Sequence, residues 1–266
     1  MTQSSSSATD PLAGIHVVVT RPRAQAGRLA ALIEQAGGHA ILFPVIEILP
    51  IAEPAQQKRL AAQLSRLSEF DFAVFISPTA VRQAMPMIAP PPVHLRFAAI
   101  GSGTARELRR MGIVDVIAPE TAGDSEALLA LPELEKVAGR RVVIFRGEGG
   151  RDLLGETLTR RGAEVEFAEC YRRAKPDAGA DTTPLFDAWR NDRLHAVIVT
   201  SSEGLGNLLE MLGDGGRAPL AKTPVFVPHP RIAEVARERG LRSVVLTGPG
   251  DDGLLRGLVE WARAGK

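Results

Sequence analysis

Short apolar runs alternate with amphipathic stretches along most of the chain, most clearly near its middle. Val142–Phe145 is a continuous, largely β-branched apolar run, as expected of a buried strand. After a glycine-rich turn, Leu154 and Leu158 fall on one face of a helical pattern. Gly162 follows, and glycine ends helices because it adopts the left-handed conformation at little cost. With a second strand at Glu164–Ala168, the stretch predicts a β-α-β unit.

The same pattern occurs earlier in the chain, which indicates a duplication. In an ungapped alignment, Arg21 falls on Arg146 and Gly37 on Gly162. Three further units recur in the same order and at nearly constant spacing, with these matches: Ser77 with Ser201, Gly112 with Gly240, and Leu128 with Leu254. The spacing far exceeds the roughly 20–50 residues of solenoid repeats, so two similar domains are predicted.

Each copy alternates strand and helix patterns. The first copy has apolar strands at 15–20, 72–76, 97–100 and 114–118, separated by helical patterns. Regular alternation of this kind predicts an α/β fold with doubly wound parallel sheets. Two extended, proline-flanked segments, 44–50 and 169–175, occupy equivalent repeat positions and suit linkers. The residues alone allow tandem domains as well as an interleaved chain.

Composition narrows the classes of function. The chain has 45% hydrophobic residues, 24% charged residues and a net charge of +1. This near-neutral balance gives no general case for nucleic-acid binding. No apolar run approaches the roughly 18 residues of a membrane span. Residues 1–12 are polar and serine-rich, unlike a signal peptide, and are predicted to be a disordered tail. We therefore expect a cytoplasmic protein that does not bind membranes.

Metal and nucleotide sites are not expected. Cys170 is the only cysteine and the five histidines lack ligand spacing. In the two glycine-rich turns, Arg106 and Asp152 stand where the third glycine of a dinucleotide fingerprint belongs. No Walker A motif, nucleophile elbow or Ser-His-Asp order is present. The protein is predicted to work without a metal or cofactor.

The turns that follow the strands are the candidate binding positions, because ligands of open parallel sheets lie beyond the carboxyl ends of the strands. Most of these turns place hydroxyls, glycines or arginine at a helix N-terminus, which favours anions. The candidate residues are Arg21, Ser77, Ser102, Gly103, Thr104, Arg146, Gly147, Gly149, Thr200, Ser201, Ser202 and His229. Serine and threonine at such positions often serve only as N-caps, so capping alone is an open alternative.

Tyr171, the only tyrosine, lies in the second extended segment. Its hydroxyl is predicted either to face a cleft between the domains or to lie in water beside a packed ring.

Several stretches together resemble uroporphyrinogen-III synthase, from Gly14 to about Leu258. The most specific is the ordered set RGEGGR, RGAEV and YRR, beside TRPRAQAGRLAALIEQAGG and AAIGSGTARELRRMG. The resemblance implies two α/β domains with an active site in the cleft between them. It implies that residues 13–44 join residues 177–266 in one domain, and that residues 52–167 form the other. Residues 45–51 and 168–176 are then the two connector strands.

The reaction that the resemblance implies is cyclisation of hydroxymethylbilane, a linear tetrapyrrole with eight carboxylates, to uroporphyrinogen III. The last pyrrole is inverted, water is lost, and no cofactor or metal takes part. By analogy, Tyr171 assists departure of the hydroxyl and Thr200–Ser202 hold substrate carboxylates. The turn at His229 departs from the family's threonine-containing turn, so its assignment is the weakest. A monomer is expected.

Two other classes of protein compete with this interpretation. A bilobed small-molecule binding or sensor protein would share the interleaved α/β architecture, although such proteins commonly carry an export signal. A nucleotide-dependent enzyme is disfavoured by the interrupted glycine motifs. Turnover of hydroxymethylbilane, with the isomer identified, distinguishes the three.

Overall fold

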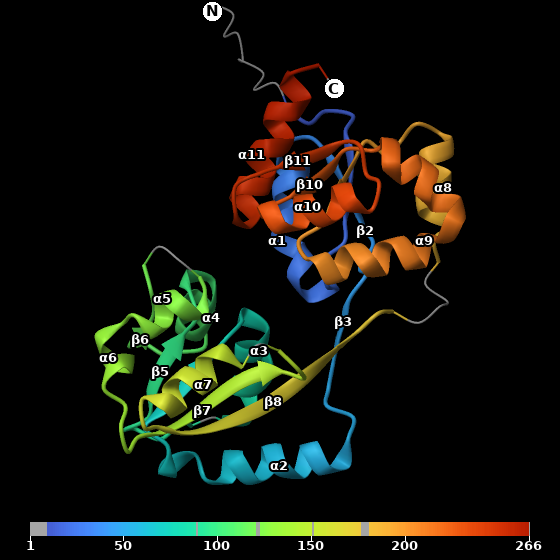
Figure 1. The fold of residues 1–266 in the computed structure, drawn as a ribbon. Coiled ribbons are helices and arrows are strands. Elements are labelled where there is room, and N and C mark those ends of the chain that lie inside the picture. Colours follow the sequence, from blue (N-terminus) through green and yellow to red (C-terminus); the bar gives the residue numbers. More distant parts are fainter. Residues whose placement is uncertain (1–9, 89, 121–122, 151, 177–180, 266) are drawn as a thin grey trace, which may run out of the picture. The chain divides into compact units, whose positions relative to one another are not determined.

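The computed structural model describes residues 10–88, 90–120, 123–150, 152–176 and 181–265. The chain divides into two compact units, each treated separately below (Figure 1). Unit 1 comprises the described residues of Met1–Glu47 and Ala174–Lys266, and unit 2 comprises those of Ile48–Arg173.

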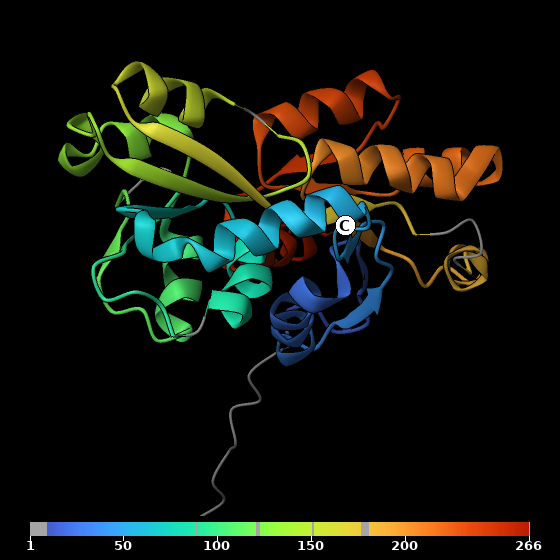
Figure 2. The ribbon, with the colours of Figure 1, turned by 90° about the horizontal axis from the view of Figure 1, so that it is seen from below.

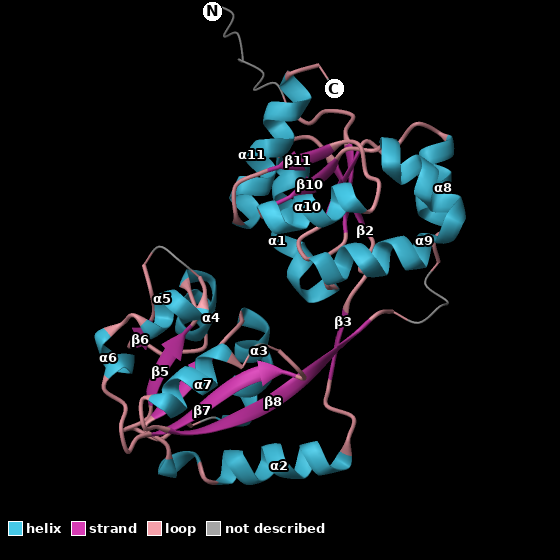
Figure 3. Cartoon of the chain, in the orientation of Figure 1, coloured by secondary structure: helices cyan, strands magenta, loops and turns pink. Residues whose placement is uncertain are grey.

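Unit 1 is a parallel sheet covered by helices on both faces (Figure 3). Its strands, in the order β11-β10-β9-β1-β2, are Val244–Leu246, Val225–Val227, Ala196–Ile198, His16–Val19 and His39–Leu42. Helices α1 (Arg23–Gln35) and α11 (Gly250–Arg263) pack on one face, where their leucines and isoleucine meet alternate strand residues. Helices α9 (Ser202–Lys222) and α10 (Pro230–Glu238) cover the other, and α8 spans Thr183–Arg190.

Unit 2 has the same two-sided arrangement. Its strands, in the order β3-β8-β7-β4-β5-β6, are Glu47–Leu49, Glu164–Ala174, Arg141–Gly147, Phe72–Phe75, Arg96–Ala99 and Val116–Ile117. One face is covered by α2 (Pro54–Ser65), the 3-10 turn Leu67–Glu69, α3 (Pro78–Ile88) and α4 (Ser102–Arg110). The other is covered by α5 (Ser125–Leu129), α6 (Pro132–Glu135) and α7 (Leu153–Arg160).

Apart from β3, an extra edge strand in unit 2, the two sheets have the same strand order once the repeats are aligned. Each unit combines parts of both copies. In unit 1, β1 and β2 from the first copy join β9, β10 and β11 from the second. In unit 2, β7 and β8 from the second copy join β4, β5 and β6 from the first. Figure 2 shows the blue N-terminal segment packed with the orange and red C-terminal elements. The predicted duplicated, interleaved α/β fold is confirmed.

Matching glycines have matching backbone conformations, which supports the repeat alignment in structural terms. Gly37 and Gly162 have φ of +85° and +87°, and Gly112 and Gly240 have φ of +92° and +87°. Each follows a helix at the point where the chain turns toward the next strand. A side chain would be strained at these four positions, so the glycines recur for a steric reason.

Strand β8 continues without interruption from Glu164 to Ala174, through residues that were expected to be connector. Cys170 and Tyr171 belong to the buried core of unit 2. The other connector contributes β3 at the edge of the same sheet. The division between the units falls after Glu47 and after Arg173, so the segment 168–173 belongs to unit 2.

Leu12 corrects the predicted tail. Residues 1–9 lie outside the described part of the chain, but Leu12 is fully buried and its N–H donates to the carbonyl of Ala36 at 2.9 Å. It packs with Ile15 and Ile33 in the unit 1 core. A single leucine in a polar stretch gives no periodic signal, which is why the pattern missed it.

We expect Leu12→Ala to lower the free energy of unfolding by about 2–4 kcal/mol, because it removes a fully buried side chain and leaves a cavity. Val93→Ala is the matched control, since Val93 is fully exposed, and its effect should stay within about 0.5 kcal/mol. Denaturant unfolding followed by circular dichroism measures both. Equal stability of Leu12→Ala and wild type would show that residue 12 is not part of the core.

Candidate active site

In each unit, the carboxyl ends of two central strands mark the position at which a parallel sheet binds ligands. In unit 2, β4 and β7 are neighbours, but α3 and α7, which follow them, cover opposite faces. A crevice opens beyond the carboxyl ends of two such strands. Ser77 follows β4 and Gly147 ends β7 there. In unit 1, the equivalent strands β1 and β9 are followed by Arg21 and Thr200–Ser202.

Tyr171 lies on β8, in the buried core of unit 2. Its side chain is only 2% exposed, and its hydroxyl lies 3.3 Å from the Ser77 hydroxyl, with either oxygen able to donate. Ser77 also caps α3, because its Oγ accepts the N–H of Ala80 at 3.0 Å. The tyrosine ring is therefore packed, but its hydroxyl contacts Ser77 and does not lie in water as that alternative had it.

A β-bulge places Tyr171 against Gly147. The register runs from Arg146 opposite Glu169 to Gly147 opposite Tyr171, so Cys170 is the extra residue. A Cβ added to Gly147 would lie 2.7 Å from Cζ of Tyr171, closer than any real contact. The ring thus rests on the bare backbone of Gly147, and glycine is needed there for close approach.

Arg146 is committed to partners inside unit 2. Its side chain is 10% exposed and donates to Asp152 at 2.8 Å and to Glu169 at 3.4 Å. Its guanidinium also stacks over the ring of Phe167, 4.0 Å from the centroid. Two carboxylates offset one guanidinium, so Arg146 offers little positive charge to a ligand.

The glycine-rich turn after β7 is held by the same carboxylates. The N–H of Gly149, whose φ is +67°, donates to Glu169 at 3.2 Å. The N–H of Glu148 donates to the carbonyl of Tyr171 at 2.7 Å. Gln56 on α2 donates to the side chains of both Glu148 and Glu169. The Gly149 N–H, predicted to be available to substrate, already has an internal acceptor.

A pocket of about 350 Å³ opens beside this turn, within the size range of small-ligand sites. Residues after β4, β5 and β7 line it, with the start of α5 and the end of β8. The lining includes Ile76, Ile100, Gly147, Gly150, Phe167 and Arg173. Arg173 is exposed at the carboxyl end of β8. Arg146 also lines the pocket, but it is ion-paired with Asp152 and Glu169.

The turn before α4 is only partly accessible. Ser102 and Gly103 are exposed, but Thr104 is 2% exposed. A Cβ added to Gly103 would lie 4.0 Å from Pro78, so the first turns of α3 and α4 are adjacent. The predicted binding role therefore fits Ser102 and Gly103, while Thr104 points into the core.

In unit 1 the predicted residues are arranged like their repeat partners. Arg21 forms an ion pair with Asp251 at the start of α11, and Arg28 also contacts Asp251. Ser201 caps α9 by accepting the N–H of Gly204 at 2.9 Å, as Ser77 caps α3. Thr200 and Ser202 are half-buried beside it, and His229 is exposed at the N-cap of α10.

The sequence did not single out Glu169, Asp251, Gln56 or Arg173. Glu169 and Arg173 lie beside Tyr171 in a segment expected to be connector, and the partners of Asp251 lie more than 200 residues away. Only the position of Arg173 in the YRR set gave a signal.

Cys170 is buried next to the site. Its Sγ lies 3.3 Å from the carbonyl of Arg146, and burial raises the pKa of the thiol to about 12. No group of histidine, cysteine or carboxylate side chains in the described ranges is placed to hold a metal ion. Within those ranges, every helix is too short or too polar to cross a bilayer.

The family model and two sequence relatives that match this chain carry the same description. Residues 27–256 match the family model described as uroporphyrinogen-III synthase HemD. The chain is 37% identical to a uroporphyrinogen-III synthase of Salmonella typhimurium, covering 91% of this chain and 99% of that one. It is 36% identical to that of Escherichia coli with the same coverage. A solved uroporphyrinogen III synthase mutant from Thermus thermophilus matches with a TM-score of 0.58 at 21% identity, covering 95% of this chain and all of that one, which shows the fold.

We expect Gly147→Ala to move the ring of Tyr171 and to lower the free energy of unfolding by about 1–3 kcal/mol through overpacking. Gly27→Ala is the matched control: Gly27 lies in α1 with open space at its Cβ position, so alanine should be neutral or stabilise by up to about 1 kcal/mol. Denaturant unfolding and tyrosine fluorescence follow both variants. Unchanged values for Gly147→Ala would contradict the close packing.

The Cys170 thiol should be inert in the folded protein. With a pKa of about 12, roughly one thiol in 10⁴ is ionised at pH 8. Reaction with Ellman's reagent at pH 8 should proceed only at the rate of unfolding and go to completion in denaturant. Stoichiometric labelling within minutes in native buffer would show that the thiol is accessible.

Proposed function

The chain belongs to the uroporphyrinogen-III synthase family, and we propose that Tyr171 is its catalytic residue, with Ser77 as its positioning partner. The reaction of the family, and hence of this chain, is cyclisation of hydroxymethylbilane to uroporphyrinogen III. The last pyrrole ring is inverted and water is lost. The observation that carries the assignment is the 3.3 Å pairing of two hydroxyls, that of Ser77 just after β4 and that of Tyr171 near the end of β8.

Cyclisation of hydroxymethylbilane needs little general acid–base catalysis. Loss of the hydroxyl from hydroxymethylbilane leaves a stabilised cation, which also closes spontaneously without inversion. The enzyme must hold the chain so that the last ring reacts through its substituted carbon. Such positioning lowers the barrier by organising the reacting atoms in advance. A single proton donor for the leaving hydroxyl is then sufficient as chemical assistance.

Tyr171 and Ser77 suit that role because of how each is held. Tyr171 is fixed by Gly147 beneath its ring and by the strand ladder, so little motion is left to its hydroxyl. Ser77 accepts the Ala80 N–H and still has a hydroxyl proton. Tyr171 gives its proton to the leaving hydroxyl, which departs as water, and the proton that the last pyrrole ring loses on ring closure restores the phenol, while Ser77 keeps it oriented.

Substrate carboxylates need donors, and several predicted residues have them. In unit 2 we assign this role to Ser102, Gly103 and the backbone of Gly147, at helix starts or at the pocket. In unit 1, Thr200, Ser202 and His229 stay predictions. Arg21, Arg146 and the Gly149 N–H have internal carboxylate partners, so in this proposal they shape the turns. That the enzyme is a cytoplasmic monomer also stays a prediction.

Tyr171→Phe should lower turnover of hydroxymethylbilane at least about tenfold, within the usual range for loss of a proton donor. Its stability should stay within about 1 kcal/mol of wild type, because the ring still packs on Gly147. The assay separates the inverted and non-inverted isomers by chromatography after oxidation. Ser77→Ala should give a smaller loss, since it removes only the partner of the phenol.

If Tyr171→Phe turns over at the wild-type rate, Tyr171 is a packing residue and another group protonates the leaving hydroxyl. Wild-type protein that yields only the non-inverted isomer would contradict the function itself.

A further inference from the structure

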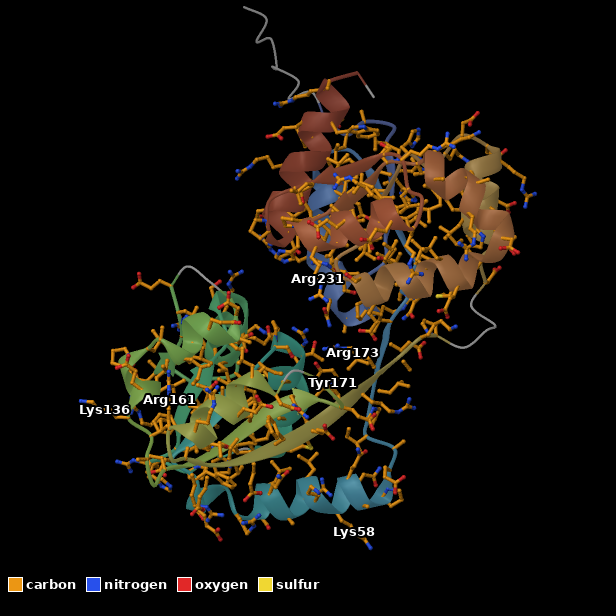
Figure 4. The ribbon with its side chains drawn as sticks, viewed as in Figure 1. Lys58, Lys136, Arg161, Tyr171, Arg173 and Arg231 are labelled. Atoms are coloured by element: carbon orange, nitrogen blue, oxygen red, sulfur yellow. The ribbon has the colours of Figure 1, made fainter. Side chains whose placement is uncertain are left out.

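We propose that Glu169 is a positioning residue for the reaction: its carboxylate holds the glycine-rich turn after β7, and the turn holds Tyr171 in place. The inference rests on the proposed function, because Tyr171 is the catalytic residue that the turn supports. Tyr171 lies toward the carboxyl end of β8 (Figure 4), and Glu169 precedes it by two residues. In the ladder between β7 and β8, Glu169 is opposite Arg146.

Three donors converge on the Glu169 carboxylate, and they come from three different segments. The N–H of Gly149 in the turn donates to Oε1 at 3.2 Å, and Arg146 on β7 donates to the same oxygen at 3.4 Å. Gln56 on α2 donates to Oε2 at 3.4 Å. The side chain is 22% exposed, and a carboxylate that has lost most of its water needs donors of this kind. Glu169 therefore links the turn to the sheet and to α2.

The turn needs such a link because its sequence gives it little rigidity of its own. Gly149 and Gly150 have φ of +67° and +136°, and both are exposed. Glycine loses more conformational freedom than any other residue when it becomes ordered. Glu169 accepts the Gly149 N–H directly. It also holds Arg146, which lies beside Gly150 and donates to Asp152 at the start of α7. The turn is thus restrained near both of its ends.

The restrained turn fixes the place of Tyr171. Gly147 is the last residue of β7, and a Cβ added to it would lie 2.7 Å from Cζ of the tyrosine ring. The next residue, Glu148, donates its N–H to the carbonyl of Tyr171 at 2.7 Å. Gly147, Gly149 and Gly150 also line the pocket of about 350 Å³. The backbone that supports the ring is therefore continuous with the wall of the pocket, and a shift of the turn would displace both.

Glu169 does not suit a direct role with the substrate. Its oxygens already accept three hydrogen bonds, and its negative charge repels the carboxylates of hydroxymethylbilane. Its contacts are polar, so its removal opens no cavity in the hydrophobic core. The loss should therefore fall on the geometry of the turn and of Tyr171 more than on stability.

The test compares three substitutions of Glu169. Glu169→Ala and Glu169→Met both remove the acceptor, and methionine keeps the length of the side chain, so whichever variant folds carries the test. Glu169→Gln keeps an oxygen that can accept the Gly149 N–H. Glu164→Ala is the matched control, because Glu164 is a carboxylate at the other end of β8 with a side chain 77% exposed. The rate of formation of the inverted isomer gives kcat and KM, and the melting temperature is measured for each variant.

For Glu169→Ala and Glu169→Met we expect kcat to fall about tenfold or more, because a small displacement of the reacting groups has effects of this order. KM should change less than about threefold, since no group that binds substrate is removed. The melting temperature should fall by roughly 2–4 °C, the effect of one ordinary hydrogen bond. Glu169→Gln should recover kcat to within about threefold of wild type, and Glu164→Ala should stay within about twofold.

The decisive measurement places the Glu169 variants in the Tyr171→Phe background. The effects of two residues that act as a unit do not add, so the second substitution has little left to remove. Glu169→Ala or Glu169→Met should therefore lower the residual kcat of Tyr171→Phe by less than about twofold. A residue that only stabilised the fold would lower it by the same factor in both backgrounds.

A kcat within about twofold of wild type in both Glu169→Ala and Glu169→Met overturns the proposal. So does the full loss in the Tyr171→Phe background, because Glu169 would then act independently of Tyr171. A loss that Glu169→Gln does not recover also contradicts it, since the turn would then not depend on the acceptor. Failure of the proposed function is seen separately, in wild-type protein that yields only the non-inverted isomer or in Tyr171→Phe that keeps the wild-type rate. Either of these results removes the basis of the proposal, and neither involves Glu169.

Discussion

Pairing between the two copies of the repeat is the constraint on which the structure depends. β4 pairs in register with β7, from Phe72 opposite Val142 to Phe75 opposite Phe145, and β1 pairs with β9 in the same way. These strands are buried on both faces, so each unit's core is built on a contact between copies. The same pairing brings the ends of β4 and β7 together. Ser77, just after β4, and Gly147, at the end of β7, therefore lie at the same edge of the sheet.

Much of the fold was predictable because its signals are local. Continuous apolar runs such as Val142–Phe145 indicate buried strands, and glycines such as Gly162 mark helix ends by a steric rule. Repetition of these signals indicated the duplication. The continuation of β8 was not predictable in the same way. Its second half, Glu169–Arg173, is mostly polar, and it is a strand because β7 and β3 lie beside it.

The candidate site, too, was predictable only where its signals are local. The turns were predicted, because Ser77 and Ser201 are N-caps by residue type and position. What those turns can bind was not predictable, because it depends on partners distant in sequence. Arg21 is offset by Asp251, which the sequence gives no reason to connect with it. The β-bulge at Cys170 is also invisible in the sequence, yet it directs Tyr171 toward Ser77.

The equivalent arginines of the two copies, Arg21 and Arg146, are each ion-paired with an aspartate of their own unit, and the reason is physical. Each lies at the carboxyl end of a central strand, where a guanidinium loses much of its water. A charge in that position is costly unless a carboxylate accompanies it. Desolvated arginines without a carboxylate partner would destabilise the free protein. They would also bind a product with eight carboxylates too tightly for rapid release. Exposed cations and helix N-termini avoid both costs, because their donors stay hydrated until the substrate arrives.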